Sequence, residues 1–162
     1  MAPQVPNNPE KVVRIGGPMA LPGLPSQIEE AIKILVCLAL SAPCAVPAST
    51  VAKCTHVPAS QVSKILNYLT WRGMVRSRRG SKGGYYLAQS PDDIHVGQVI
   101  QLFRPAFKKP SGWPPDPLLR IWSETSAAAQ QAWEQLSIAE LARRTAGDWE
   151  HCFECKESGV PA

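Results

Sequence analysis

Residues 58–88 decide the fold of this chain, and they read PASQVSKILNYLTWRGMVRSRRGSKGGYYLA. Apolar residues in the first half recur at the 3.6-residue spacing of a helix, which predicts a helix from Pro58 to about Trp71. Proline suits the first helical position because its missing N–H would be unpaired there, and Gly73 ends the helix. The predicted buried stripe of this helix consists of Val62, Ile65, Leu66 and Leu69.

The second half of this stretch predicts a β-hairpin. Met74–Arg78 and Tyr85–Ala88 are the expected strands, and Gly80–Gly84 is the turn between them. A short helix over Ala48–Cys54 is expected to precede the helix from Pro58. Two such helices followed by a basic hairpin form a winged helix-turn-helix, so the predicted fold class is mainly α with a small β-hairpin wing.

The outward face of the helix from Pro58 is polar and free of carboxylates, because its residues recur at i, i+3, i+4 and i+7. Such a face can exchange hydrogen bonds with base edges without repelling phosphates. The hairpin tip carries basic side chains among glycines, which let the backbone approach a phosphate or enter a minor groove. The candidate DNA-binding residues are Ser60, Gln61, Ser63, Lys64, Asn67, Arg78, Arg79, Gly80, Lys82, Gly83 and Gly84.

The 162-residue chain has a net charge of +4, but its charges are unevenly distributed. Residues 31–91 contain no Asp or Glu and eight Lys or Arg, whereas residues 110–162 contain eight acidic and four basic residues. A long carboxylate-free span builds a positive surface, which attracts polyanions and gains affinity by counterion release. Double-stranded DNA is therefore the first expected partner, and a solvated basic face that only aids solubility is the alternative.

The remaining sequence predicts four further helices. A first helix from Ser26 to Leu40 is expected to begin with Ser26 and Glu29 as a capping box, and a short helix is expected from Val96 to Phe103. The predicted parts are a flexible Pro- and Gly-rich arm at 1–25, the winged helix-turn-helix domain at 26–104, a Pro-rich loop at 105–117, a dimerisation helix and short final helix at 118–146, and a tail with a CxxC motif at 147–162.

The long helix expected from Leu118 to Leu136 carries an apolar face that exceeds what one wing domain can cover. We therefore expect a second copy of the chain to cover it, which makes the protein a homodimer. Ser137 and Glu140 form a capping-box pattern that opens the final helix, which runs to about Thr145. The predicted dimer interface consists of Leu118, Ile121, Trp122, Thr125, Ala129, Ala132, Trp133 and Leu136.

The sequence argues against an enzyme and against a membrane protein. It contains no glycine-rich phosphate loop, nucleophile elbow, paired carboxylates or HExxH helix. Its longest apolar run, Ile34–Leu40, is far shorter than the ~20 residues of a spanning helix. Residues 1–25 lack the continuous apolar segment of a secretory signal, so a cytoplasmic location is expected.

The five cysteines raise the question of a metal or redox site. His151, Cys152 and Cys155 form a CxxC motif with an adjacent histidine, which could hold Zn²⁺ or an iron–sulfur cluster if a second copy completed the set, or form a redox disulfide. Complete zinc sites usually show two CxxC pairs, so inert thiols in an exposed tail are the favoured interpretation. Cys37 and Cys54 are expected to fill the core.

Two segments resemble the Rrf-type family of bacterial winged-helix transcription regulators, the group that includes IscR, NsrR and CymR. Lys64–Ala88 is similar to the end of the family's recognition helix and its GGY-containing wing, and Val96–Ile100 is similar to the helix that follows. The resemblance covers roughly residues 28–141. It implies a homodimer that places the helix from Pro58 in the major groove, the wing in the minor groove and the long helix in the dimer interface.

This sequence also departs from the family pattern in three places. His56 stands at the family's turn glycine, which implies a left-handed backbone that histidine tolerates better than most residues. Gln61 and Ser63 stand where the family frequently has Tyr and Glu, so no operator sequence is implied. The loop at 108–116 contains no cysteine, whereas iron–sulfur members have three there, so the resemblance implies a member without a cluster at that site.

These observations together predict a sequence-specific DNA-binding transcriptional regulator that acts as a homodimer, with repression as its expected mode and no cofactor. One alternative is an interaction or assembly protein that kept the fold and lost DNA recognition. Another is a thiol- or metal-responsive protein that uses the C-terminal HCxxC motif.

Overall fold

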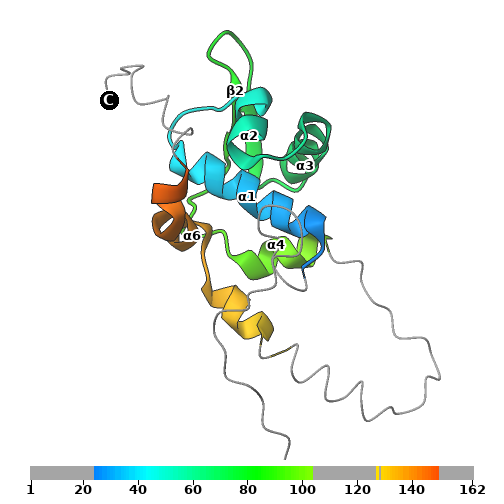
Figure 1. Cartoon of the computed structure of the whole chain (residues 1–162), viewed down its shortest axis with the longest axis vertical. Coiled ribbons are helices and arrows are strands. Elements are labelled where there is room, and N and C mark those ends of the chain that lie inside the picture. The colour runs from blue at the N-terminus through cyan, green and yellow to red at the C-terminus, as the bar shows by residue number, and fades with distance from the viewer. Residues whose placement is uncertain (1–23, 104–126, 128, 150–162) are drawn as a thin grey trace, which may run out of the picture.

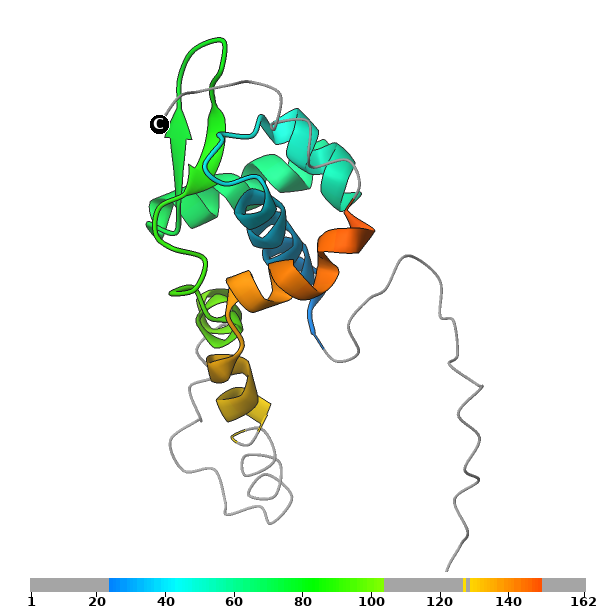
Figure 2. The same cartoon turned by 90° about the vertical axis from the view of Figure 1, so that its left-hand side faces the viewer.

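The structure is a computed structural model that describes residues 24–103, 127 and 129–149. Helix α1 lies at the centre, with α2, α3 and the hairpin on one side and α4 and α6 on the other (Figures 1 and 2). No helix within these ranges has the length and apolar run needed to cross a bilayer. In chain order the elements are α1 (Ser26–Leu40), α2 (Ala48–Thr55), α3 (Ala59–Trp71), β1 (Val75–Arg78), β2 (Gly84–Leu87), α4 (Val96–Phe103), α6 (Ile138–Thr145) and a 3-10 turn (Ala146–Asp148).

Helix α1 is central because it is apolar around most of its circumference. It packs against α2, α3, α4, α6 and strand β2, so it holds the two sides of the domain together. The helix has the predicted bounds, and Cys37 is buried in it as expected. Its buried apolar residues are Ile28, Ala31, Ile32, Ile34, Leu35, Val36, Cys37 and Leu38.

The capping box predicted at Ser26 is wrong. Pro25 occupies the N-cap position with φ −55° and ψ 137°, and Ser26 is already the first helical residue. The Pro25 carbonyl accepts hydrogen bonds from the N–H groups of Ile28 and Glu29 at 2.9 and 3.3 Å, and the Glu29 carboxylate instead pairs with Lys33 at 2.6 Å. An N-cap residue needs an extended ψ and a carbonyl acceptor, and proline supplies both without an N–H.

The same arrangement begins α2 and α3. Pro47 (φ −60°, ψ 145°) and Pro58 (φ −54°, ψ 135°) are their N-cap residues, and neither helix has a side-chain cap. The sequence predicts Pro58 at the first helical position. In the structure Pro58 is the N-cap, and α3 begins one residue later, at Ala59. The Pro58 carbonyl accepts the N–H groups of Gln61 and Val62 at 2.9 and 3.0 Å.

The turn between α2 and α3 is tight because His56 adopts a left-handed backbone with φ 55°, which confirms the conformation implied at this position. The Thr55 hydroxyl donates to the Val51 carbonyl at 2.7 Å, so the hydroxyl of this buried side chain has a hydrogen-bond partner. Val57, the next residue after His56, is buried. The turn therefore fixes how α3 crosses α2.

Strands β1 and β2 form the predicted hairpin, shifted by about one residue from the expected bounds. They pair antiparallel with Val75 opposite Leu87 and Arg78 opposite Gly84. The loop before α2 adds a further pairing, because the N–H and carbonyl groups of Val46 and Tyr85 bond each other in both directions at 2.8 Å. The base of the wing is thereby joined to the entrance of the helix-turn-helix.

The C-terminal part of the described chain returns to α1. Ser137 caps α6 as predicted, since its side-chain oxygen accepts the Glu140 N–H at 3.1 Å. Residues 129–135 are helical, but Leu136 leaves the helix and its carbonyl accepts the Val96 N–H at 2.9 Å. The predicted long helix starting at Leu118 lies mostly outside the described residues, as do the predicted arm at 1–25 and tail at 147–162, and the predicted Pro-rich loop at 105–117 lies entirely outside them.

The Ser137 cap can be tested by substitution. We expect Ser137→Ala to lower the free energy of unfolding by about 1 kcal/mol, because one N–H at the start of α6 loses its acceptor. Ser137→Asn keeps a capping side chain and should stay within a few tenths of a kcal/mol of the wild type. Urea unfolding followed by far-UV circular dichroism measures both variants, and equal stability of the alanine and asparagine variants would contradict the assignment.

Candidate nucleic-acid interface

Helix α3 presents a polar face to solvent and an apolar face to the core. Val62, Ile65, Leu66 and Leu69 are buried, as predicted, whereas Ser60, Ser63, Lys64 and Asn67 are exposed and Gln61 is half-buried. The Ser63 hydroxyl donates to the Ala59 carbonyl at 3.0 Å, so its oxygen is available mainly as an acceptor. Lys64 and Asn67 are thus the residues best placed to donate to an external ligand.

Helix α3 ends at a glycine that permits the chain to turn sharply into the wing. Gly73 has φ +76°, and its N–H donates to the Thr70 carbonyl at 3.0 Å, while the Met74 N–H reaches back to the Leu69 carbonyl at 3.0 Å. This pattern is the Schellman ending of a helix, which requires a residue with positive φ. It sets the direction in which β1 leaves α3.

The wing tip holds three exposed basic residues, Arg78, Arg79 and Lys82. The turn closes through a 2.9 Å hydrogen bond from the Gly83 N–H to the Gly80 carbonyl, and Gly80 has φ +111°. The Arg78 guanidinium carbon lies 5.7 Å from the centre of the Tyr86 ring, an arrangement that restricts the side chain without neutralising its charge. The structure therefore brings all three basic residues together at one protruding end.

The charges on α3 and the wing are not balanced by acidic partners within the described part of the chain. The ion pairs of the described residues involve other side chains, namely Lys33–Glu29, Arg143–Asp92, Arg143–Glu140 and Arg144–Glu140. Because residues 31–91 contain no carboxylate, the field around this surface is positive and favours a polyanion. We call this set the basic surface: Ser60, Lys64, Asn67, Arg72, Arg76, Arg78, Arg79 and Lys82.

The candidate DNA-binding residues predicted from the sequence do not include the exposed side chains at the C-terminal end of α3. Trp71 is 76% exposed, and it follows Lys64 and Asn67 by seven and four residues, so it lies on the same helix face. Arg72 stacks beside it, with its guanidinium carbon 5.7 Å from the centre of the Trp71 ring. The spacing of four residues between Asn67 and Trp71 is the sequence signal that indicates a place for Trp71 on the same helix face.

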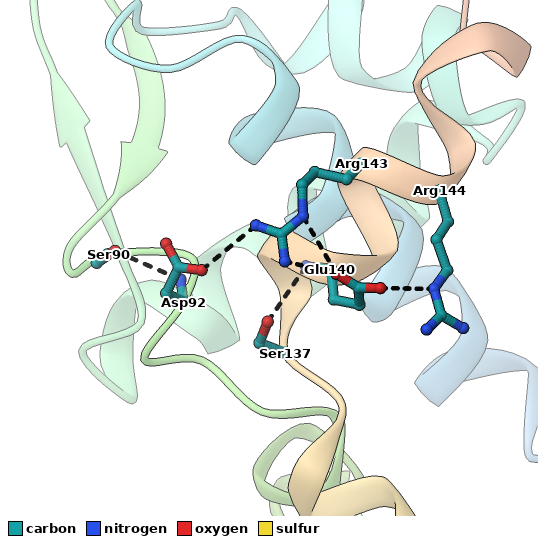
Figure 3. Close-up of polar contacts among 6 residues, drawn as sticks. All are labelled: Ser90, Asp92, Ser137, Glu140, Arg143 and Arg144. Carbon is teal, nitrogen blue, oxygen red and sulfur yellow. Dashed lines mark hydrogen bonds and ion pairs between the residues drawn. The ribbon is translucent and has the colours of Figure 1, made fainter.

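A second group of basic residues lies on α6, and it differs from the basic surface because its charges are paired. Figure 3 shows Glu140 between Arg143 and Arg144, with Asp92 on the far side of Arg143. Hydrogen bonds from Arg143 and then Arg144 lower the pKa of Glu140, so its carboxylate stays ionised. This cluster borders an open hollow of about 400 Å³ that Leu136 also lines.

The predicted dimer face is only partly described. Ala129 and Ala132 are exposed, whereas Trp133 and Leu136 are half-buried and pack against the core of their own chain. The helix at 129–135 approaches α4 closely, since a Cβ on Gly97 would lie 2.9 Å from Cγ of Glu134. Leu118, Ile121, Trp122 and Thr125 lie outside the described residues. The dimer interface stays a prediction.

The predicted metal or redox residues His151, Cys152 and Cys155 also lie outside the described residues. Cys44 is disulfide-bonded, whereas Cys37 and Cys54 remain thiols. Within residues 24–103, 127 and 129–149, no three His, Cys, Asp or Glu side chains come together as metal ligands, so no metal site is assigned to this part of the chain.

Comparison with known proteins places these features in a family. The sequence model of the Rrf2 family, described as iron-dependent transcriptional regulators, matches residues 24–144. A protein of Aquifex aeolicus (strain VF5) is 35% identical over 81 residues, which are 50% of this chain and 56% of that protein. A protein of Synechocystis sp. (strain ATCC 27184 / PCC 6803 / Kazusa) is 41% identical over 71 residues, which are 43% of this chain and 48% of that protein. Both are named as HTH-type transcriptional regulators, and this chain spans about half the length of these curated relatives.

Solved structures share the fold. IscR of T. potens superposes with a TM-score of 0.67 at 20% identity, over 75% of this chain and 87% of that one. CymR of B. subtilis, titled a global cysteine regulator, gives a TM-score of 0.67 at 22% identity, over 75% of this chain and 97% of that one. These likenesses confirm the winged-helix architecture. Because the family model spans most of the chain, including α1, the helix-turn-helix, the wing and α6, this protein belongs to the Rrf2 family of transcriptional regulators.

Proposed function

We propose that this chain is a sequence-specific DNA-binding transcriptional regulator that acts in the cytoplasm as a homodimer. The observation that carries the proposal is the basic surface, in which the polar face of α3 and the wing tip carry positive charges without described acidic partners. Membership of a family of transcriptional regulators supports it. The proposal contains no catalytic step, as is general for such regulators.

Each part of the basic surface has its own task in this proposal. Ser60, Lys64 and Asn67 face base edges in the major groove, where asparagine can bond an adenine and lysine a guanine. Arg78, Arg79 and Lys82 contact phosphates or the minor groove. Two copies of the surface would read half-sites about one helical turn, or 34 Å, apart. A dimer bound across a promoter blocks access of RNA polymerase, and this is why repression is the proposed mode.

The first experiment selects bound duplexes from a random library and measures their affinity by fluorescence anisotropy at several salt concentrations. We expect an inverted repeat, tighter binding to the selected duplex than to an unrelated duplex, and affinity that falls steeply with salt. Light scattering of the free protein reports whether it is a dimer. Binding without enrichment of any sequence would favour an interaction protein that retained only the fold.

Two single variants separate base readout from phosphate contact. We expect Asn67→Ala to cost about 1–3 kcal/mol on the selected duplex and little on an unrelated duplex, because asparagine reads a base. We expect Arg79→Ala to weaken binding to both duplexes and to lower the salt slope by about 1, because it removes one phosphate contact. Anisotropy titrations measure both effects, with Gln131→Ala, an exposed residue outside the basic surface, as the control. If Asn67→Ala weakened both duplexes equally, α3 would not read sequence through Asn67.

A further inference from the structure

The last turn of α3 exposes an aromatic ring next to a cation. Trp71 is 76% exposed, and among the described residues it is the large apolar side chain that the fold leaves open. Arg72 follows it, and its guanidinium carbon lies 5.7 Å from the centre of the Trp71 ring and 6.0 Å from the centre of the Tyr68 ring. A large apolar ring in water forgoes the free energy of burial, so this pair is suited to a partner that is both apolar and anionic.

Tyr68 fixes the pair to the body of the domain. Its hydroxyl donates to the Leu102 carbonyl at 2.8 Å, and its ring centre lies 4.9 Å from that of Phe103. The Trp71 ring centre lies 6.1 Å from the Tyr68 ring. Tyr68 is therefore held from α4, and the Trp71 ring and the Arg72 guanidinium lie beside the Tyr68 ring.

The position of Trp71 along α3 indicates which part of a DNA duplex it meets. Ser60 and Trp71 are eleven residues apart on one helix face, a separation of about 16 Å at 1.5 Å per residue. The major groove is about 12 Å wide. When Ser60, Lys64 and Asn67 lie in the groove, as in the proposed function on which this inference rests, Trp71 lies at its rim, where deoxyribose and phosphate form the surface.

We propose that Trp71 and Arg72 form a backbone-contacting edge of the DNA interface. The indole ring packs on a deoxyribose, and the Arg72 guanidinium bonds the adjacent phosphate, which arginine can do with two N–H groups at once. Sugar and phosphate are the same at every base pair, so this edge adds affinity for all sequences and no discrimination between them. Both residues lie in the carboxylate-free span, so their neighbours in sequence carry no negative charge that would repel that phosphate.

The experiment compares Trp71→Ala and Arg72→Ala with the wild type on a duplex obtained by selection and on an unrelated duplex of equal length. We expect Trp71→Ala to weaken binding about tenfold on both duplexes, as removal of a packed tryptophan does in other interfaces, with an unchanged salt slope. We expect Arg72→Ala to lower the salt slope by about 1. Ethylation interference should show phosphates at the rim of each half-site that matter for the wild type and not for Arg72→Ala.

Arg144→Ala is the matched control, because it removes the same charge from a side chain that is paired with Glu140 and lies outside the basic surface. It should bind both duplexes as the wild type does. Far-UV circular dichroism should show each variant folded, since Trp71 and Arg72 are exposed.

Three results would overturn the inference. If Trp71→Ala binds both duplexes as tightly as the wild type while Asn67→Ala weakens the selected one, the proposed function stands and this edge does not contact DNA. If light scattering shows that Trp71→Ala dissociates the protein, a second copy of the chain covers the ring instead. If the wild type binds no duplex at all, the proposed function and this inference fail together.

Discussion

Replacement of Gly84 by alanine is expected to lower the free energy of unfolding by about 3 kcal/mol or more, from backbone strain and a steric clash together. Gly84 has φ +154°, and a Cβ there would lie 2.4 Å from the carbonyl carbon of Val46 and 2.7 Å from the nitrogen of Pro47. These are backbone atoms, and Val46 is held by two hydrogen bonds to Tyr85. Neither β2 nor the loop that contains Val46 can move aside without breaking the joint between the wing and α2.

Two other glycines give the matched controls for Gly84→Ala. Gly80 has φ +111° but open space around its Cβ position, so Gly80→Ala should cost only the backbone strain of about 1 kcal/mol. Gly147 also has open space and no positive φ, so Gly147→Ala should be close to neutral. Urea unfolding of the three variants measures this order. A Gly84→Ala variant as stable as Gly80→Ala would show that the Val46 contact is not tight.

The second large effect is expected at the wing tip. The triple variant Arg78→Ala, Arg79→Ala, Lys82→Ala removes three exposed positive charges from each copy of the wing. If each meets one phosphate, the slope of log affinity against log salt should fall by about 3 per copy. The affinity for every duplex should then drop about 100-fold or more at low salt, from the same counterion effect. Stability should change little, because all three side chains are exposed.

A charge-preserving variant shows whether charge or geometry matters at the wing tip. Arg78→Lys with Arg79→Lys keeps both charges, so the salt slope should stay near the wild-type value, while affinity falls only where a bidentate contact is lost. Anisotropy titrations from low to moderate salt measure both variants. A triple alanine variant that binds as the wild type does would remove the wing from the interface.

Local sequence patterns predicted most of the elements around α3. The spacing of Val62, Ile65, Leu66 and Leu69 marked its buried face, and Gly73 marked its end. Ser137 was identified as the cap of α6. Each of these features depends on residues a few positions apart, where helix geometry and capping chemistry act directly.

The misses have two different causes. Ser26 was favoured as a cap because serine is a good acceptor, yet the extended backbone of the neighbouring Pro25 decides where α1 begins. Trp71 is absent from the predicted interface because a large apolar residue at the end of a helix is typical of a core, whereas in the structure its side chain is exposed. Trp133 and Leu136, two residues of the predicted dimer face, also pack against their own chain, and the dimer interface stays a prediction.

The sequence by itself determined the order of helices and strands, the polar face of α3 and the carboxylate-free span, because periodicity and charge are properties of the chain. Only the tertiary structure decided that Val46 joins the wing to the helix-turn-helix and that Tyr68 anchors the end of α3 to α4. It also decided that the basic residues of α6 are paired while those of the wing lack described acidic partners. These contacts join residues that are far apart in the chain, and such partners are chosen by packing around α1, which no local pattern records.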